Sequence, residues 1–282
     1  MKAFTILCLA LLAAGCGGSS SDSSASASTG DQAGPAPVTG GDWYQPVPLT
    51  TWQWQLQGTV NESYAVEMYD IDLFDADISV IQSLQASGKK VICYFSGGSY
   101  ENWRDDAGAF DDADLGNALD GWDGERWLDI RNQNVRDIMA ARLDVAVDKG
   151  CDGVEPDNMD GYTNDPGFDV TAADQLDYNR WLANAAHTRE LAVALKNDLA
   201  QVGDLVDYFD FAVNEQCFEY DECDKLQPFI DANKAVFNAE YLDAYRTNTA
   251  QRNALCTASV NRQFSTLILD LELDDSYRES CN

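Results

Sequence analysis

The sequence predicts one (β/α)₈ barrel, a single domain of the α/β class. Three observations predict it. Short apolar runs typical of buried strands alternate with longer segments of helical periodicity, and this alternation favours parallel strands joined by helical crossovers. The runs number eight, which is the strand count of a closed barrel. The segment that contains them, residues 42–282, has the length of one such barrel and holds no internal repeat or second domain.

The predicted strands are short, apolar or alternating runs, most of which end in polar residues. Periodicity alone would also allow a helix at residues 191–197. The eight runs lie at residues 52–56, 65–72, 90–96, 152–157, 191–197, 209–215, 235–240 and 265–270.

Helices are predicted between several of these strands. Residues 77–87 and 132–149 place apolar side chains at helical spacing, and a glycine directly follows each segment as a stop signal. Residues 171–187 form the next predicted helix, with Thr171 as its N-cap. The chain therefore returns from one strand to the next through helices, as a parallel barrel requires.

A long segment without clear periodicity, residues 97–128, interrupts this alternation. It contains Trp103, Trp122 and Trp127 together with several acidic residues. Loops of this length in a compact domain are usually functional. Flat apolar tryptophan faces there would suit packing against sugar rings.

The N-terminus has the pattern of an export signal. Lys2 precedes an apolar stretch, Phe4 to Leu12, that is too short to span a bilayer. We predict a lipoprotein signal peptide over residues 1–15, lipidation of Cys16, and a flexible Gly/Ser-rich tether over 16–41. The alternative is an ordinary secretory signal in which Cys16 is incidental. Either way we expect an exported protein, held at the bacterial cell envelope by a lipid anchor in the membrane or secreted.

The six cysteines of the folded part are an even number in an exported chain, which indicates three disulfides. Cys217 and Cys223 lie close enough to clip one loop, and Cys256 with Cys281 would secure the C-terminus. Cys93 and Cys151 then remain as the third pair. Spacing alone leaves other pairings open.

The composition is strongly acidic, with 48 Asp and Glu against 18 Lys and Arg and a formal charge of −30. Nucleic acids and other polyanions are therefore excluded as partners, because they bind basic surfaces. An acidic surface suits cationic ligands, and salt adaptation would produce it equally well. We expect a monomer.

Polar side chains gather at the downstream ends of the predicted strands, where (β/α)₈ barrels build their active sites. Carboxylates crowded there would differ in pKa, so that one donates a proton while another stays ionised, as glycoside hydrolysis requires. Any single acid taken alone is better interpreted as a cap or a solvated loop residue. The set comprises Asp70, Asp72, Tyr94, Ser96, Glu155, Asp157, Lys196, Asn197, Glu215, Glu240, Asp270 and Glu272.

Other chemistries lack their residues. The single histidine, His187, falls inside a predicted helix, where a packing or surface role is expected rather than a catalytic triad. No zinc-protease motif, paired CxxC or phosphate-binding glycine loop occurs. Aligning Gly161 with the sixth position of an EF-hand places Pro156 first, which excludes that motif and leaves only an irregular calcium site open. We predict no cofactor and no metal.

Six segments together resemble glycoside hydrolase family 114, which contains endo-α-1,4-polygalactosaminidases and spherulin-4-like proteins. They occur in order from Trp52 to Tyr241, and the chain after Tyr241 carries little of the resemblance. The segments are residues 52–56 (WQWQL), 94–101 (YFSGGSYE), 150–158 (GCDGVEPDN), 195–198 (LKND), 213–217 (VNEQC) and 237–241 (FNAEY).

The resemblance implies a barrel that cleaves α-1,4 bonds in galactosamine-containing polysaccharide, with endo action and retention of configuration. It implies Asp157 as the nucleophile and Glu215 as the general acid/base. Amino groups of the substrate would meet surplus carboxylates, and other polar residues would complete the substrate site. The substrate-binding candidates are Asp70, Asp72, Tyr94, Glu155, Asn158, Lys196, Asn197, Glu240 and Asp270.

Two residues near the fifth strand depart from the family pattern. Glu190 and Ala194 stand where glycines are common, and Glu190 is expected to affect turn geometry more than catalysis. Two other functions remain open: a glycosidase for another α-linked sugar, and a barrel that binds surface polysaccharide without cleaving it.

Overall fold

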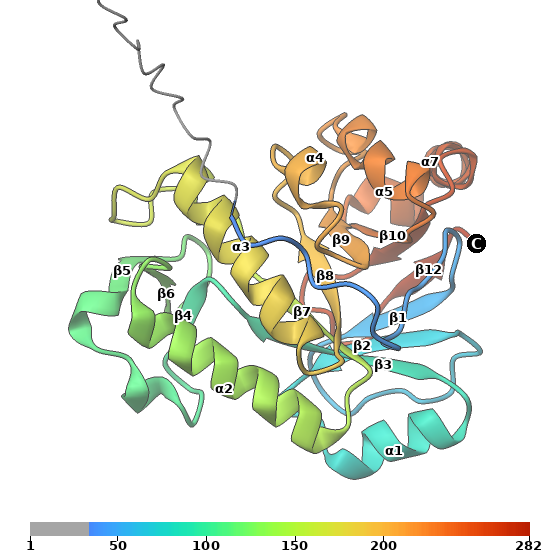
Figure 1. The fold of residues 1–282 in the computed structure, drawn as a ribbon. Coiled ribbons are helices and arrows are strands. Elements are labelled where there is room, and N and C mark those ends of the chain that lie inside the picture. The colour runs from blue at the N-terminus through green and yellow to red at the C-terminus, as the bar shows by residue number, and fades with distance from the viewer. Residues whose placement is uncertain (1–33) are drawn as a thin grey trace, which may run out of the picture. The chain divides into compact units, whose positions relative to one another are not determined.

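The computed structural model describes residues 34–282, and it has a parallel sheet curled into a (β/α)₈ barrel (Figure 1). Each of the eight predicted strands is present, and every neighbouring pair among them is parallel. In sheet order they are β1 (Trp52–Gln55), β2 (Met68–Asp72), β3 (Lys90–Ser96), β7 (Gly153–Asp157), β8 (Ala192–Lys196), β9 (Phe211–Glu215), β10 (Val236–Glu240) and β11 (Ser265–Leu269).

Helices pack around the outside of this sheet (Figure 1). The three predicted helices are confirmed, and at the last of them Thr171 forms a capping box with Asp174. The α-helices are α1 (Ile78–Ala86), α2 (Gln133–Lys149), α3 (Ala172–His187), α4 (Val202–Leu205), α5 (Gln227–Asp231), α6 (Asp243–Thr247) and α7 (Thr249–Asn261). Short 3₁₀ turns are η1 (Ala107–Ala109), η2 (Asp112–Asp114), η3 (Gly161–Thr163) and η4 (Cys223–Leu226).

The segment 97–128, predicted to be irregular, contains a small antiparallel sheet. Its strands are β4 (Ser99–Glu101), β5 (Leu115–Ala118) and β6 (Glu125–Leu128), in the order β4-β6-β5. Their sequences, SYE, LGNA and ERWL, show no sustained alternation of apolar and polar residues, which is why the sequence does not reveal them. We call this segment the insert. It links the end of β3 to α2.

A further unpredicted strand, β12 (Arg278–Ser280), pairs antiparallel with β11. β12 and β1 are the two ends of the sheet, and side chains join them: the Arg278 guanidinium donates to the carbonyl of Trp52 at 2.8 Å and to Gln53 Oε1 at 2.5 Å. The amides of Leu56 and Gln57 both donate to the carbonyl of Leu273. This seam closes the barrel without a strand ladder.

Alternation along the strands separates two apolar clusters. One fills the barrel interior and includes Trp52, Phe211 and Phe237. The other lies between the sheet and the helices and includes Val193 and Leu195 of β8. Burying each such side chain stabilises the fold by about 1.5–3 kcal/mol, and the period of two decides which strand residues can reach the central pocket.

At the floor of the barrel, where the strands begin, the only histidine has a packing role, as predicted. The His187 ring stacks on Trp43 with centroids 4.1 Å apart. Asp210 holds both rings, accepting from Trp43 Nε1 at 2.7 Å and pairing with His187 Nε2 at 2.9 Å. The amide of Val193 donates to the same carboxylate at 2.9 Å. We call this group the floor cluster.

Residues 34–50 run from α3 to β1 as an ordered strap, drawn in dark blue in Figure 1. Asn184 of α3 holds it, accepting from the amide of Val38 at 2.7 Å and donating to the carbonyl of Ala36 at 3.0 Å. Part of the predicted tether, residues 34–41, therefore contacts a helix through the Ala36 carbonyl and the Val38 amide. The predicted signal peptide, the Cys16 site and tether residues 16–33 lie outside the described residues.

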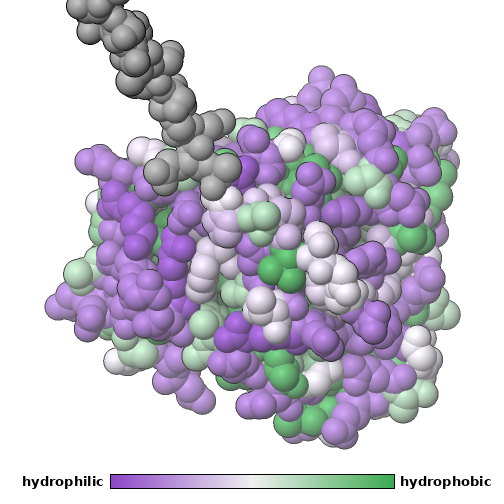
Figure 2. All heavy atoms as spheres, viewed as in Figure 1, coloured by the Kyte–Doolittle hydropathy of each residue, from purple (hydrophilic) through white to green (hydrophobic). Residues whose placement is uncertain are grey.

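The three disulfides are Cys93–Cys151, Cys217–Cys223 and Cys256–Cys281, which confirms the predicted pairing. The described face in Figure 2 is mostly hydrophilic, in keeping with the acidic composition. Within residues 34–282, no helix combines the length and apolar character needed to cross a bilayer.

Candidate active site

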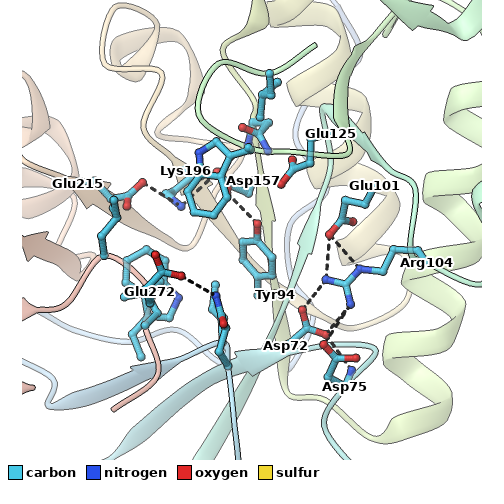
Figure 3. Close-up of a pocket in the computed structure, with 18 of the residues that line it drawn as sticks. Asp72, Asp75, Tyr94, Glu101, Arg104, Glu125, Asp157, Lys196, Glu215 and Glu272 are labelled. Atoms are coloured by element: carbon cyan, nitrogen blue, oxygen red, sulfur yellow. Dashed lines mark hydrogen bonds and ion pairs between the residues drawn. The ribbon is translucent and has the colours of Figure 1, made fainter. Parts of the chain in front are cut away.

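A pocket of about 540 Å³ opens at the carboxyl ends of the strands (Figure 3). The barrel contributes Tyr94, Asp157, Lys196 and Glu215, and the insert forms the opposite wall. Eight carboxylate residues and two cationic ones line the pocket, so its lining is strongly negative. The acids are Asp72, Asp75, Glu101, Glu125, Asp157, Asp160, Glu215 and Glu272, and the cations are Arg104 and Lys196.

The Lys196 ammonium lies between the two predicted catalytic carboxylates. Its Nζ is 3.1 Å from Asp157 Oδ1 and 3.3 Å from Glu215 Oε2. These two oxygens are therefore at most about 6.4 Å apart, the sum of the two distances. Residues far apart in the chain meet because β7, β8 and β9 are neighbours and their side chains of like parity all point inward.

Tyrosine hydroxyls hold the outer oxygens of the same carboxylates. Tyr94 donates to Asp157 Oδ2 at 3.0 Å, and Tyr241 donates to Glu215 Oε1 at 2.5 Å. Burial and the neighbouring carboxylate raise the pKa of each phenol well above its usual value, so both remain donors. Asn197 Oδ1 accepts the amide of Glu215 at 3.0 Å and fixes the end of β9.

Lys196 is buried and stays charged. Burial lowers its pKa, but Asp157, Glu155 and Glu215 together outweigh that effect and raise the pKa well above the ordinary value. The Trp54 ring lies beneath it, with its centroid 4.7 Å from Nζ. One permanent cation therefore serves both catalytic candidates.

Two predicted substrate-binding acids, Asp70 and Glu155, are fully buried in the barrel interior and do not line the pocket. Glu155 pairs with Lys196 at 3.1 Å. Burial raises the pKa of Glu155 to about 7 and that of Asp70 well above its usual range. Their burial leaves no surface for a sugar, so direct substrate contact, as predicted from the sequence, has no support here.

Glu240 and Asp270 are likewise outside the pocket lining. Glu240 is buried on the outer side of β10, where it accepts the amide of Phe218 at 2.9 Å, and burial raises its pKa to about 7. Asp270 pairs with Arg246 at 2.6 Å. Both serve neighbouring loops. The strand period predicts this for Glu240, because Ala239 and Tyr241 on either side of it belong to the interior side of β10.

The other candidates do line the pocket: Asp72, Tyr94, Asn158, Lys196 and Asn197. Asp72 is already engaged, since Arg104 donates to both of its oxygens at 3.1 and 2.6 Å. Arg104 also donates to Glu101 at 2.9 Å. These ion pairs fasten the insert to β2 and form the right-hand wall of the site in Figure 3.

The insert supplies two of the tryptophans expected to face sugar rings, and Glu125, which was not assigned a role from the sequence. Glu125 lines the pocket and accepts from Ser99 Oγ at 2.6 Å, and burial raises its pKa to about 7. Trp103 and Trp122 also line it and are 51% and 45% exposed, whereas Trp127 is buried. The long tryptophan-rich segment was the only sequence signal for this wall.

Backbone strain marks both the site and the floor. Asn158 and Asn197 have φ of 60° and 50°, the left-handed region that asparagine tolerates best after glycine. Glu190, which stands where the family commonly has glycine, has φ of 59° at the turn after α3. The departure therefore falls on turn geometry far from the pocket, as the sequence suggested.

Among the described residues, no cluster of three or more His, Cys, Asp or Glu side chains is arranged to hold a metal ion. Two facing carboxylates, a pocket at the carboxyl end of a (β/α)₈ barrel and exposed tryptophans at its rim define a barrel glycosidase.

Comparison with known proteins identifies the particular family. The model of glycoside-hydrolase family GH114 matches residues 33–282, and the chain belongs to this family. It is also similar to the crystal structure of Aspergillus fumigatus Ega3 in complex with galactosamine, with 47% identity and a TM-score of 0.81. That match covers 86% of this chain and 99% of Ega3.

More distant structures share the fold alone. The glycoside hydrolase domain of PelA from Pseudomonas aeruginosa is 12% identical with a TM-score of 0.62, over 79% of this chain and 95% of that domain. The trehalulose synthase MutB from Pseudomonas mesoacidophila is 11% identical with a TM-score of 0.54, over 76% of this chain and 63% of MutB. No curated protein matches the chain.

Proposed function

We propose that the protein is an endo-acting, retaining α-1,4-glycosidase of galactosamine-containing polysaccharide. The observation that carries the proposal is the pair Asp157 and Glu215, facing one pocket across a shared lysine. Membership of GH114 and the similarity to Ega3, whose structure contains galactosamine, support the substrate class.

Asp157 is the nucleophile in this proposal. Lys196 and the Tyr94 hydroxyl both contact its carboxylate, which must attack the anomeric carbon as the glycosidic bond breaks. Glu215 gives its proton to the leaving oxygen and then takes a proton from the water that releases the glycosyl-enzyme. A retaining mechanism needs carboxyl groups about 5–5.5 Å apart, and the upper bound of about 6.4 Å set by Lys196 accommodates that spacing.

The pocket's surplus of carboxylates suits a cationic polymer. Lys196 and Arg104 are both paired already, so Glu125, Asp160 and Glu272 are left to face ligand. We assign to these three the recognition of substrate ammonium groups that the sequence had suggested for Asp70, Glu155, Glu240 and Asp270. An ammonium beside a carboxylate forms a charge-assisted hydrogen bond.

The first experiment incubates the purified protein with partly deacetylated galactosaminogalactan. We expect new reducing ends, early oligosaccharide products rather than monosaccharide, and retained anomeric configuration by NMR. Asp157→Asn should reduce kcat about 10⁴-fold or more, and Glu215→Gln about 10²–10⁴-fold. Equal cleavage of fully N-acetylated polymer would contradict amino-group recognition, and an inverted product would contradict the retaining assignment.

Matched controls come from carboxylates outside the pocket. Glu240→Gln and Asp270→Asn make the same chemical changes, and we expect them to leave kcat near wild type. Activity of both catalytic variants equal to that of these controls would contradict the catalytic assignment. Absence of turnover by the wild type would leave a polysaccharide-binding protein. If only another α-linked polymer were cleaved, the substrate assignment would be wrong and the catalytic pair would stand.

We also propose export with a lipid anchor at Cys16, a signal peptide over 1–15 and action as a monomer outside the cell. The three disulfides support an oxidising compartment. Expression in bacteria with a labelled fatty acid should label the wild type and not Cys16→Ser. Label on both, or on neither, would contradict lipidation at this residue.

A further inference from the structure

Two fully buried carboxyl groups below the catalytic pair have one ammonium beside them and no other hydrogen-bond donor. Asp70 of β2 and Glu155 of β7 are both inaccessible to solvent. Apart from the Lys196 ammonium, 3.1 Å from Glu155 Oε1, no N–H or O–H group among residues 34–282 donates a hydrogen bond to any of their four oxygens. The Asp70 and Glu155 carboxyl groups are within hydrogen-bonding reach of each other.

Two adjacent ionised carboxylates cannot persist there. Each buried anion without a partner costs several kcal/mol, and the two charges would also repel each other. A single proton held between them removes both penalties, because it neutralises one group and gives the other a donor. The proton is the donor that the hydrogen-bond pattern lacks.

Lys196 decides which of the two groups keeps the proton. It contacts Glu155 directly, which favours the ionised form of Glu155. Burial and the neighbouring Glu155 charge raise the pKa of Asp70 well above its usual range, with Asp157 adding to the effect and Lys196 opposing it. The groups that face Asp70 are thus Glu155, Asp157 and Lys196.

We propose that Asp70 is a neutral carboxylic acid that donates its proton to Glu155 and, through Glu155, positions Lys196 between Asp157 and Glu215. The inference rests on the proposed function only in naming Asp157 and Glu215 as the reacting groups. Asp70 is a positioning residue, since it is buried beneath the pocket and touches no substrate.

The arrangement matters because three carboxylates compete for one ammonium. A second full charge at Asp70 would strengthen the pull from below and draw Nζ away from the catalytic pair. Removing the proton donor would leave Glu155 free to turn. A protonated Asp70 avoids both the displacement of Nζ and the rotation of Glu155. Lys196 then keeps its contacts with Asp157 and Glu215.

The test measures the state of Asp70 directly by infrared difference spectroscopy. The carbonyl stretch of a protonated carboxyl group should persist in the wild type above pH 8, where Asp198, whose pKa is raised to about 8, is mostly ionised. Asp70→Asn should abolish this band, and Glu240→Gln should keep it. Absence of the band in the wild type, or its persistence in Asp70→Asn, overturns the proposal whether or not the enzyme cleaves the expected polymer.

Kinetics provide the second readout. Asn at position 70 is neutral and its amide can donate to Glu155, so Asp70→Asn should retain kcat within about threefold. Asp70→Ala should lower kcat about 10²-fold with little change in KM, the effect of a misplaced catalytic group. Should Asp70→Ala not fold, Asp70→Asn and the spectrum still decide. Loss of activity in a folded Asp70→Asn, with Glu155→Gln active, would place the proton on Glu155 and contradict the assignment.

Discussion

The two ends of the barrel use carboxylates in opposite ways. At the floor, Asp210 meets three donors, from Trp43, His187 and Val193, and has no vacancy for another ligand. At the mouth, Asp157 and Glu215 share a single ammonium, each accepts from one tyrosine hydroxyl, and the Asn158 amide and Asn197 Nδ2 also donate to them. The two ends differ in exposure: the Asp210 side chain is 6% exposed, whereas those of Asp157 and Glu215 are 20% and 25% exposed and face the pocket.

The difference shows how one fold separates stability from chemistry. A buried carboxylate whose oxygens are occupied by protein donors joins neighbouring elements and is inaccessible to a substrate. Carboxylates that outnumber their cations at an open pocket keep capacity for a proton, a sugar carbon or an ammonium group. Substitutions at the two ends should therefore change different measured quantities.

The largest effect is expected at Lys196. Lys196→Met leaves Glu155, Asp157 and Glu215 without a cation, so kcat should fall about 10²-fold or more. The free energy of unfolding should fall by about 3–5 kcal/mol, the cost of breaking a buried pair. Kinetics with the polymer and urea unfolding measure the two losses.

Lys90→Met is the matched control at the floor end of β3. Its half-exposed ion pair with Asp152, at 2.7 Å, should contribute at most about 1 kcal/mol, and kcat should not change. If Lys196→Met behaved like Lys90→Met, the mouth would not depend on a shared cation.

At the floor, Trp43→Phe should reduce stability and spare activity. Phenylalanine keeps the stacking on His187 and loses the hydrogen bond from Nε1 to Asp210. A buried acceptor that loses its donor costs about 1–3 kcal/mol. Thermal unfolding should register this loss while kcat/KM stays constant; a large fall in kcat/KM would mean that floor and mouth are coupled.

Glu240, a buried carboxyl group outside the pocket, should make stability depend on pH. Its pKa is raised by burial from the ordinary 4.5 to about 7, so the folded state holds a proton that the unfolded state releases. The folded state is not penalised by this group below pH 4.5, where it is protonated in both states. Stability is lost as the pH rises toward 7, because the buried group must keep a proton that the unfolded chain releases. Glu240→Gln cannot ionise, so between these values it should gain up to about 3 kcal/mol relative to the wild type. Urea unfolding across the range measures the difference, and parallel curves would contradict it.

The smallest effects come from a pair of glycine substitutions at positive φ. Glu190→Gly, at the floor end, relieves a left-handed residue and should change stability by about 1 kcal/mol or less, with stabilisation expected. Asn197→Gly relieves similar strain at the mouth but removes the acceptor for the amide of Glu215. It should lower kcat about tenfold. Equal kinetic effects of the two would remove the distinction between the ends.

Most of the barrel follows from the sequence because its strands are buried on both faces. Residues 91–95 and 211–213 are continuous apolar runs within two of these strands, and stop signals such as Gly150 end the helices between strands. The strands of the insert and β12 were missed because their short, largely polar sequences carry no periodic signal. The strap was missed because its hydrogen bonds come from α3, far away in sequence.

The acidic residues of the site could be predicted from the sequence. Which of them point into the pocket and which point away from it could not. Alternation along β10 explains why Glu240 supports a loop while Tyr241 reaches Glu215. The wall containing Glu125 and Trp122 depends on how the insert folds back over the strands, which no local pattern encodes. The sequence places Asp70 at the end of a strand, but only the folded structure shows that its side chain is fully buried.

The seam between β1 and β12 has a consequence for local opening. Most neighbouring strands exchange several backbone hydrogen bonds, whereas here an arginine side chain and the carbonyl of Leu273 span the gap. Leu271, Glu272 and Leu273, which approach this seam, also line the pocket. Such a join separates at lower free energy than a strand ladder, so amide hydrogens along β1 should exchange with solvent before those of β8. The side of the pocket formed by Leu271, Glu272 and Leu273 would then open more easily than the side formed by β8.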